Sequence, residues 1–225
     1  TMGGALILVS IAISTLLWGD LTNRYVWVVL VTTMAFGVVG LVDDYRKLVL
    51  RDARGLAPRW KYLWQSLFGI AAALALYGTA VLPAETQLQF PFFKDLVLNL
   101  GPAFVVLSYF VIVGSSNAVN LTDGLDGLAA SIVVLAFAAY GVIAYLQGPW
   151  TYLVRFCFTM VGALMAFLWY NVHPAQMFMG DSGSLSLGAT LGVIALMTGQ
   201  WLLLPLIALI PVAEALSSML QVAYF

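Results

Sequence analysis

Charged side chains are scarce in this sequence. Asp, Glu, Lys and Arg make up 8% of the 225 residues, and hydrophobic residues make up 63%, with a mean hydropathy of +1.00. An ordinary soluble domain carries roughly 25% charged residues. The composition therefore excludes a soluble globular protein. The net charge of −1 offers no basic surface, so no nucleic-acid partner is expected.

Cysteine and histidine are almost absent, with one of each. Cys157 lies in an apolar run and cannot form an internal disulfide, so we expect a small buried or lipid-facing side chain. A zinc site of His and Cys ligands is excluded. No nucleophile motif accompanies His173, which we interpret as structural. A charged leader is also lacking after Thr1, and we expect the chain to be a fragment of a longer protein.

Long apolar runs are abundant, and they predict an all-α polytopic integral membrane protein. A helix needs about 20 apolar residues to cross the hydrocarbon layer, and it satisfies its own backbone there. Only Gly199 and Gln200 separate the last two runs, so one long bent helix is an alternative to two spans. Pro205 and Pro211 predict kinks. Eight spans are predicted, over residues 2–18, 25–42, 62–82, 97–114, 128–146, 152–170, 185–198 and 201–224.

The basic residues predict the orientation of the chain. Six of the nine fall in the loop after the second predicted span, namely Arg46, Lys47, Arg51, Arg54, Arg59 and Lys61. Short cytoplasmic loops carry the positive excess, so this loop is predicted to be cytoplasmic. By alternation, the loops after the fourth and sixth spans lie on the same side. In the outer segment, the polar and apolar alternation at residues 86–90 predicts a small hairpin.

Three polar clusters are therefore predicted to lie at the same face of the membrane. The first is VDDYRK, in which Asp43 and Asp44 directly follow an apolar run. Carboxylates at a membrane boundary are costly and usually functional. They could share a divalent cation, or one could take a proton. Lys47 could contact phosphate one helical turn later. The alternative is an ordinary pair of solvated helix-end carboxylates.

The second cluster, NLTDGLDG, is typical of a turn that starts a helix, because Asn, Thr and Asp are capping residues. A helix N-terminus can hold phosphate, but Asp123 and Asp126 would repel a bare phosphate. They suggest instead a metal, or hydrogen bonds to sugar hydroxyls and base N–H groups. Pure capping remains the alternative.

The third cluster, FMGDSGSLSLG, contains Asp181, a candidate Mg²⁺ ligand or helix cap. Phe178 could stack on a planar base or anchor at the interface. Asn171 could be a C-cap or contact substrate. Glu214, within the last run, is an intramembrane carboxylate that could be functional or simply packed. Hard oxygen ligands, lysines and helix starts at one interface together predict Mg²⁺-assisted phosphoryl transfer between a water-soluble and a lipid-borne partner.

Five stretches show a resemblance that runs nearly end to end. They are TMGG, VDDYRK, ARGLAPRWKYLWQS, NAVNLTDGLDGLA and FLWYNVHPAQMFMGDSGSLSLG. The chain resembles the phospho-N-acetylmuramoyl-pentapeptide transferases, a family among the polyprenyl-phosphate N-acetylhexosamine-1-phosphate transferases. The resemblance implies transfer of phospho-N-acetylmuramoyl-pentapeptide from its UDP carrier to undecaprenyl phosphate. The products are lipid I and UMP, the cofactor is Mg²⁺, and the reaction is the first membrane step of peptidoglycan synthesis.

The resemblance also implies roles for individual residues. Asp43, Asp44 and Asp181 match the essential carboxylates, with Asp181 as the metal ligand and Asp43 deprotonating or positioning the lipid phosphate. The substrate-binding residues implied are Lys47, Lys61, Asn117, Asn120, Asp123, Asp126, Asn171 and Phe178.

The same resemblance implies a site on the cytoplasmic face of the bacterial inner membrane, and a homodimer by analogy. Family members have ten spans, of which this chain would supply the second to the ninth. We therefore expect residues 1–225 to be a single transmembrane transferase domain truncated at both ends. Three rival hypotheses are a related enzyme that uses UDP-N-acetylglucosamine, a transporter with broken helices and midplane charges, and a purely structural membrane scaffold. The scaffold would leave the clustered Asp and Lys residues without a purpose.

Overall fold

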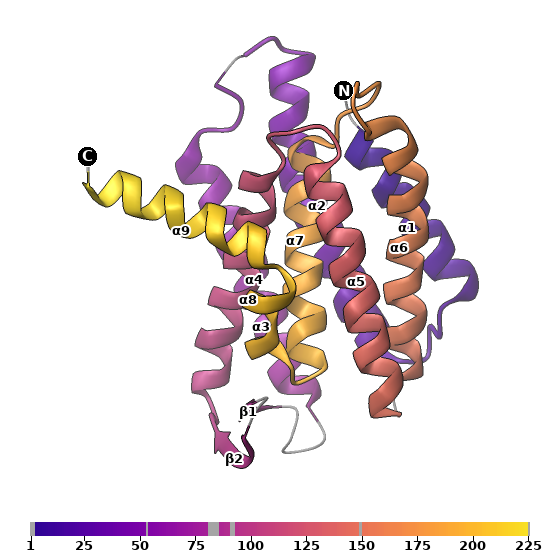
Figure 1. The fold of residues 1–225 in the computed structure, drawn as a ribbon, viewed down its shortest axis with the longest axis vertical. Helices are drawn as coiled ribbons and strands as arrows, with labels where there is room; N and C mark the ends of the chain where they lie inside the picture. Colours follow the sequence, from indigo (N-terminus) through magenta and orange to yellow (C-terminus); the bar gives the residue numbers. More distant parts are fainter. Residues whose placement is uncertain (1–2, 53, 81–85, 91–92, 149, 225) are drawn as a thin grey trace.

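The structure is a computed structural model that describes residues 3–52, 54–80, 86–90, 93–148 and 150–224. It is a helical bundle with one small hairpin at its lower end (Figure 1). The elements, in chain order, are α1 (Gly3–Trp18), α2 (Arg24–Leu48), α3 (Pro58–Thr79), β1 (Gln87–Phe90), β2 (Phe93–Asn99), α4 (Ala103–Thr122), α5 (Leu128–Gln147), α6 (Thr151–Asn171), α7 (Gly180–Met197), the 3₁₀ helix η2 (Trp201–Leu203), α8 (Leu204–Ile207) and α9 (Leu209–Tyr224).

Helix α7 forms the centre of the bundle (Figure 1), and every residue from Ser182 to Met197 is buried. Helices α2 and α4 pack most extensively on it. Small residues permit this close approach: a Cβ on Gly188 would lie 2.4 Å from the Ser115 carbonyl oxygen. The Thr33 and Thr190 hydroxyls are hydrogen-bonded at 2.7 Å. The centre of the bundle thus contains close backbone and hydroxyl contacts beside its hydrophobic core.

Several helices are suited to crossing a membrane. In the described part of the chain, α2, α4, α5 and α6 are long and apolar enough, and the pair formed by residues 201–207 and α9, bent by 86°, is a fifth candidate. The protein is therefore a multi-pass, all-α membrane protein. Helix α1 is apolar but has 16 residues, and α3 and α7 are not among the candidates. Eight spans remain a prediction.

The helix boundaries differ from the sequence-based ones at several helix ends. The fourth span was predicted from residue 97, but Val97 pairs with Gln89 in the hairpin and α4 begins only at Ala103. The stretch Leu96–Leu100 is short and apolar except for Asn99, a pattern that strands and helices share. Helix α2 continues to Leu48 rather than ending at residue 42. Helix α7 begins at Gly180, five residues before its predicted start.

The C-terminal part departs most from a straight span. The chain turns at Gly199, where φ is +69°, so α7 does not continue as one long helix into residues 201–224. That stretch is itself broken, and α9 projects away from the bundle (Figure 1). The hairpin predicted from residues 86–90 is confirmed, with Leu88 opposite Leu98 in an antiparallel pair.

Candidate functional site

Three carboxylates meet where α2 ends and α7 begins. One ligand oxygen from each of Asp43, Asp44 and Asp181 lies within 4.8 Å of the others. Asp43 is 2% exposed and Asp44 is 6% exposed. Negative charges buried this close together require compensation by cations or hydrogen bonds. The first and third polar clusters of the sequence, 137 residues apart, thus form one acidic centre.

Asp44 holds the start of α7. Its two carboxylate oxygens accept hydrogen bonds from the N–H groups of Asp181 at 3.0 Å and Ser182 at 2.9 Å. These are orphan donors of the first helical turn, and a negative charge there is favourable. Gly180 has a φ of +72°, and a Cβ on it would lie 2.7 Å from Asp44 Oδ2. Asp44 therefore caps a helix that is distant in sequence.

Asp43 is enclosed by the loop that follows α2. Its Oδ1 accepts a hydrogen bond from the Leu56 N–H at 2.7 Å, and its Oδ2 forms an ion pair with Lys47. Gly55, with a φ of +60°, lies against the carboxylate, because a Cβ there would be 2.6 Å from Oδ1. The backbone of the basic loop thus orients this carboxylate.

Two lysines and an amide converge on Asp181. The Nζ atoms of Lys61 and Lys47 lie 2.7 Å and 3.2 Å from its Oδ2. Asn120 donates from Nδ2 to its Oδ1 at 2.9 Å. Three carboxylates and two ammonium groups leave one excess negative charge. A divalent cation would reverse that sign and make the centre attractive to phosphate.

The centre opens onto a cavity of about 270 Å³. Residues of all three polar clusters line it, namely Asp44, Lys47, Asn120, Asp123, Gly124, Leu125, Asp126, Asn171, Phe178, Gly180 and Asp181. The arrangement can hold a hard cation on one wall and a polar ligand with phosphate groups beside it. Phe178, which lines the cavity, is 52% exposed.

Asp123, at the end of α4, lies in the field of the acidic centre. Burial and the negative charges of Asp181 and Asp44 raise the pKa of the Asp123 carboxyl to about 7. Asp126 behaves in the opposite way. Hydrogen bonds from the Ala175 N–H at 3.1 Å and from His173 at 3.0 Å lower the pKa of Asp126 below its usual range. Near neutral pH, these two cavity carboxyls therefore differ in charge.

Two of the predicted substrate-binding residues have contacts that organise the protein itself. Asn171 is 3% exposed. Its Oδ1 accepts from the Gly127 N–H at 3.1 Å, and its Nδ2 donates to the Met177 carbonyl at 2.8 Å, so it joins two loops of the cavity rather than capping α6. Asn117 does not line the cavity. It donates to Gln65 Oε1 at 3.0 Å and to the Val113 carbonyl at 2.8 Å.

The structure adds residues that the sequence analysis did not single out. Gln65 is 2% exposed within α3, and a polar residue in an apolar helix was the signal that could have found it. Ser184 accepts from Asn120 at 2.8 Å. The glycines of TMGG also have a role, because Gly4 donates to the Met179 carbonyl at 2.8 Å, directly before α7. Glu214 is exposed on α9 and does not line the cavity.

The fold and the centre define the class of protein. It is a multi-pass membrane protein with a buried acidic centre, two lysines and a polar cavity at one end of its bundle. The model of glycosyl transferase family 4 matches residues 26–199, which include all three polar clusters. The chain belongs to glycosyl transferase family 4, and it is therefore a membrane transferase that passes a phosphosugar to a lipid carrier.

Proposed function

We propose that this protein transfers phospho-N-acetylmuramoyl-pentapeptide from its UDP carrier to undecaprenyl phosphate, and that it forms lipid I and UMP. The observation that carries the proposal is the convergence of Asp43, Asp44 and Asp181 with two lysines beside a polar cavity. The choice of donor rests on the stretches TMGG, RWKY and WYNVHPAQMFMGD, which resemble the pentapeptide transferases. The reaction would take place on the cytoplasmic face, because the basic loop after α2 adjoins the site.

The donor set fits a magnesium ion. Carboxylate oxygens are the ligands that Mg²⁺ prefers, and one oxygen from each of the three Asp residues is within 4.8 Å of the others. Asp181 would hold the ion, with Asp43 and Asp44 beside it. A bound Mg²⁺ would neutralise the charge that develops on the diphosphate as its phosphoanhydride bond breaks.

The protein side chains have separable roles in this proposal. Asp43, oriented by the Leu56 N–H, would position the undecaprenyl phosphate and accept its proton. Asp44 would act through α7, because its two oxygens hold the helix start that carries Asp181. Lys47 and Lys61 would exchange their contacts with Asp181 for contacts with the phosphates of the donor.

An apolar cavity suits the lipid acceptor. It measures about 310 Å³ and lies between α4 and the broken segment of η2, α8 and α9. Its walls are nearly all hydrophobic, including Val111, Leu204 and Met219. Helix α4 joins the two regions, because Ala118 and Val119 line the apolar cavity and Asn120 lines the polar one. A polyprenyl chain in the apolar cavity would bring its phosphate toward the acidic centre.

The test is UMP release by the full-length protein in detergent, with Mg²⁺, a polyprenyl phosphate and UDP-N-acetylmuramoyl-pentapeptide. We expect turnover that Asp181→Asn reduces by at least 100-fold. The matched control is Asp52→Asn, since Asp52 lies in the same basic loop and its carboxylate accepts a hydrogen bond only from the Arg54 N–H, at 3.1 Å, among the described residues. This variant should keep its activity.

Three results would contradict the proposal. Turnover of UDP-N-acetylglucosamine in place of the pentapeptide donor would assign the protein to the related enzymes. Activity that persists in EDTA would show that the reaction does not require a magnesium ion. The absence of UMP release with both donors would favour the transporter hypothesis.

A further inference from the structure

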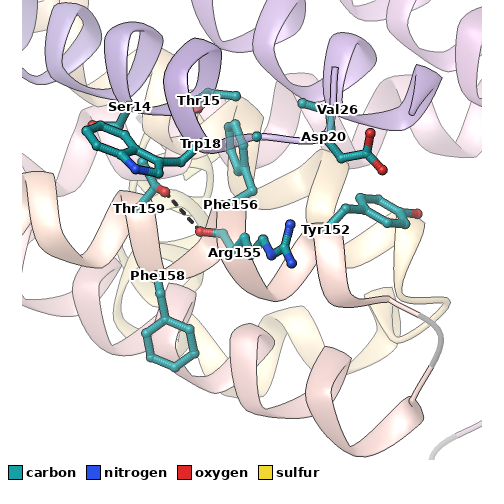
Figure 2. A pocket seen from close by; sticks show the side chains of 11 residues that line it. Ser14, Thr15, Trp18, Asp20, Val26, Tyr152, Arg155, Phe156, Phe158 and Thr159 are labelled. Carbon is teal, nitrogen blue, oxygen red and sulfur yellow. Dashed lines mark hydrogen bonds between the residues drawn. The ribbon is translucent and has the colours of Figure 1, made fainter. Parts of the chain in front are cut away.

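A second polar cavity lies at the end of the bundle opposite the acidic centre. Helix α1 begins with Gly3 and Gly4 beside the start of α7 and ends at Trp18. Helix α2 runs the other way, from Arg24 toward Asp43. The cavity, of about 330 Å³, lies where α1 ends, α2 begins and α6 begins (Figure 2). The transferase proposal uses none of its residues.

The cavity pairs one cationic and one anionic side chain. Arg155 comes from α6 and Asp20 from the turn after α1. In the part of the chain that the structure describes, the Arg155 guanidinium makes no hydrogen bond and no ion pair within 4.0 Å. Figure 2 shows it extending between Phe156 and Tyr152. The Asp20 carboxylate is oriented by Thr22, which donates to Oδ1 from its N–H at 3.1 Å and its hydroxyl at 2.6 Å.

The Asp20 carboxylate and the Arg155 guanidinium interact electrostatically without forming an ion pair. The Thr22 hydrogen bonds are the main cause that lowers the pKa of Asp20, and the Arg155 charge lowers it further. The Asp20 carboxyl is therefore charged at neutral pH. The pair is open to a ligand that carries both a negative and a positive group.

A buried hydroxyl in the wall lacks a partner. Thr15 is 4% exposed and lines the cavity, and its Oγ1 has no hydrogen-bond partner among the described residues. A buried polar group in this state carries a desolvation cost that no hydrogen bond offsets. A polar ligand group between α1 and α6 would relieve this cost. The site therefore has a built polar wall in addition to the charge pair.

The remaining walls are aromatic and typical of a membrane boundary. Trp18 is 72% exposed, Phe158 is 49% exposed, and Phe156 is buried at 4%. Trp and Tyr concentrate at headgroup level, where one end of the ring is apolar and the other is wet. A ligand here would have a polar head among Asp20, Arg155 and Thr15 and an apolar part along the phenylalanines.

From these features we propose that the cavity binds the headgroup of a phosphatidylethanolamine. The phosphate takes the Arg155 guanidinium, the ammonium donates to the Asp20 carboxylate, and an acyl chain follows Phe156 and Phe158. An anionic lipid such as phosphatidylglycerol would leave Asp20 facing a negative charge. A phosphatidylcholine has no N–H to donate. The site thus selects both the charge pair and the N–H groups of the headgroup.

The test is lipid binding by the full-length protein in detergent, measured by native mass spectrometry with equimolar short-chain phosphatidylethanolamine, phosphatidylglycerol and phosphatidylcholine. We expect one phosphatidylethanolamine bound about tenfold more tightly than either competitor. Arg155→Gln should weaken its binding about tenfold, and Asp20→Asn should reduce it to the level of phosphatidylcholine. Arg24→Gln is the matched control, because Arg24 lies over the Tyr25 ring at the same end and does not line the cavity.

A second measurement, the thermal midpoint, distinguishes a loss of lipid binding from poor folding of a variant. Phosphatidylethanolamine should raise the thermal midpoint of the wild type and of Arg24→Gln by the same amount, and it should raise that of Arg155→Gln less. Equal binding of the three lipids would overturn the proposal, as would a preference that survives both Arg155→Gln and Asp20→Asn. Displacement of the lipid by an equal concentration of soluble phosphoethanolamine would overturn the lipid assignment. None of these results depends on UMP release.

Discussion

At the scale of single residues, the acidic centre assigns different tasks to side chains of the same type. Asp43 accepts one N–H bond from the loop after α2 and an ion pair from Lys47. Asp44 directs both oxygens to the α7 backbone. Asp181 is held by two lysines and one amide. Removing the charge from each should therefore have separable effects.

Asp44→Asn should lower both activity and stability. The amide has one acceptor oxygen where two backbone N–H groups need one each, so one N–H of the first turn of α7 is left unsatisfied. Hydrogen bonds to charged groups contribute about 1.5–3 kcal/mol. We expect UMP release to fall by at least tenfold and the thermal midpoint in detergent to fall by several degrees. An unchanged midpoint would show that Asp44 does not hold the helix.

Asp123→Asn should make the metal-free protein more stable at pH 8. The pKa of Asp123 is raised from 3.8 to about 7 in the folded state, so the folded protein binds more protons than the unfolded chain between those values. This group's contribution to stability is therefore lost as pH rises from about 4 to 7. In EDTA, the midpoint of Asp123→Asn should exceed that of wild type at pH 8, and the difference should shrink at pH 5. The same difference at both pH values would contradict the raised pKa.

At the scale of elements, helix packing on α7 depends on small residues. Gly40 of α2 faces the start of α7 so closely that a Cβ would lie 2.1 Å from the Asp181 carbonyl oxygen. Gly188 and Gly192 of α7 have similar contacts with the Ser115 backbone and side chain. In lipid, helix association relies on such close packing. The positions of Asp43 and Asp44 relative to Asp181 follow from this approach.

Gly188→Val should disrupt the α4 and α7 interface. Its Cβ would be 2.4 Å from the Ser115 carbonyl oxygen, a backbone atom that cannot move without separating the helices. We expect a thermal midpoint at least 10 °C below wild type, or no folded protein in size-exclusion chromatography. Gly162→Ala in α6 is the control, since a Cβ there meets nothing within 4 Å. A folded Gly188→Val with a wild-type midpoint would refute the packing.

At the scale of the whole molecule, α4 connects a polar cavity with an apolar one. The bend of 86° before α9 directs that helix away from the bundle (Figure 1). Residues of α4, η2, α8 and α9 line the apolar cavity. Under the proposed function, a water-soluble donor and a lipid acceptor would reach the centre from different directions. Their binding should therefore respond separately to substitutions.

Ala215→Trp should affect the lipid acceptor alone. Ala215 lines the apolar cavity, and an indole there would occupy the space of the polyprenyl chain. We expect the KM for polyprenyl phosphate to rise at least fivefold and the KM for the nucleotide donor to stay within twofold. Ala213→Trp, exposed on α9 and not lining this cavity, is the control. Equal rises in both KM values would place the acceptor elsewhere.

The sequence predicted several features because they depend on local chemistry. Apolar runs predicted the helices, since burial of apolar side chains and closure of backbone hydrogen bonds operate within one segment. The basic loop and the Asp and Asn clusters indicated the three parts of the centre. The short alternation at residues 86–90 predicted the hairpin. The start of α4 was predicted wrongly, because a stretch of five residues of which four are apolar is compatible with either period.

By itself, the sequence determined that this is a helical membrane protein with carboxylates, amides and lysines at helix ends. Only the tertiary structure decided which of these side chains meet and what each one does. Asp44 caps a helix 137 residues away, Asn171 joins two loops, and Arg155 shares a cavity with Asp20. These outcomes depend on how closely α1, α2, α4 and α6 approach one another and α7. Backbone packing between distant segments sets that approach, and no local pattern in the sequence contains it.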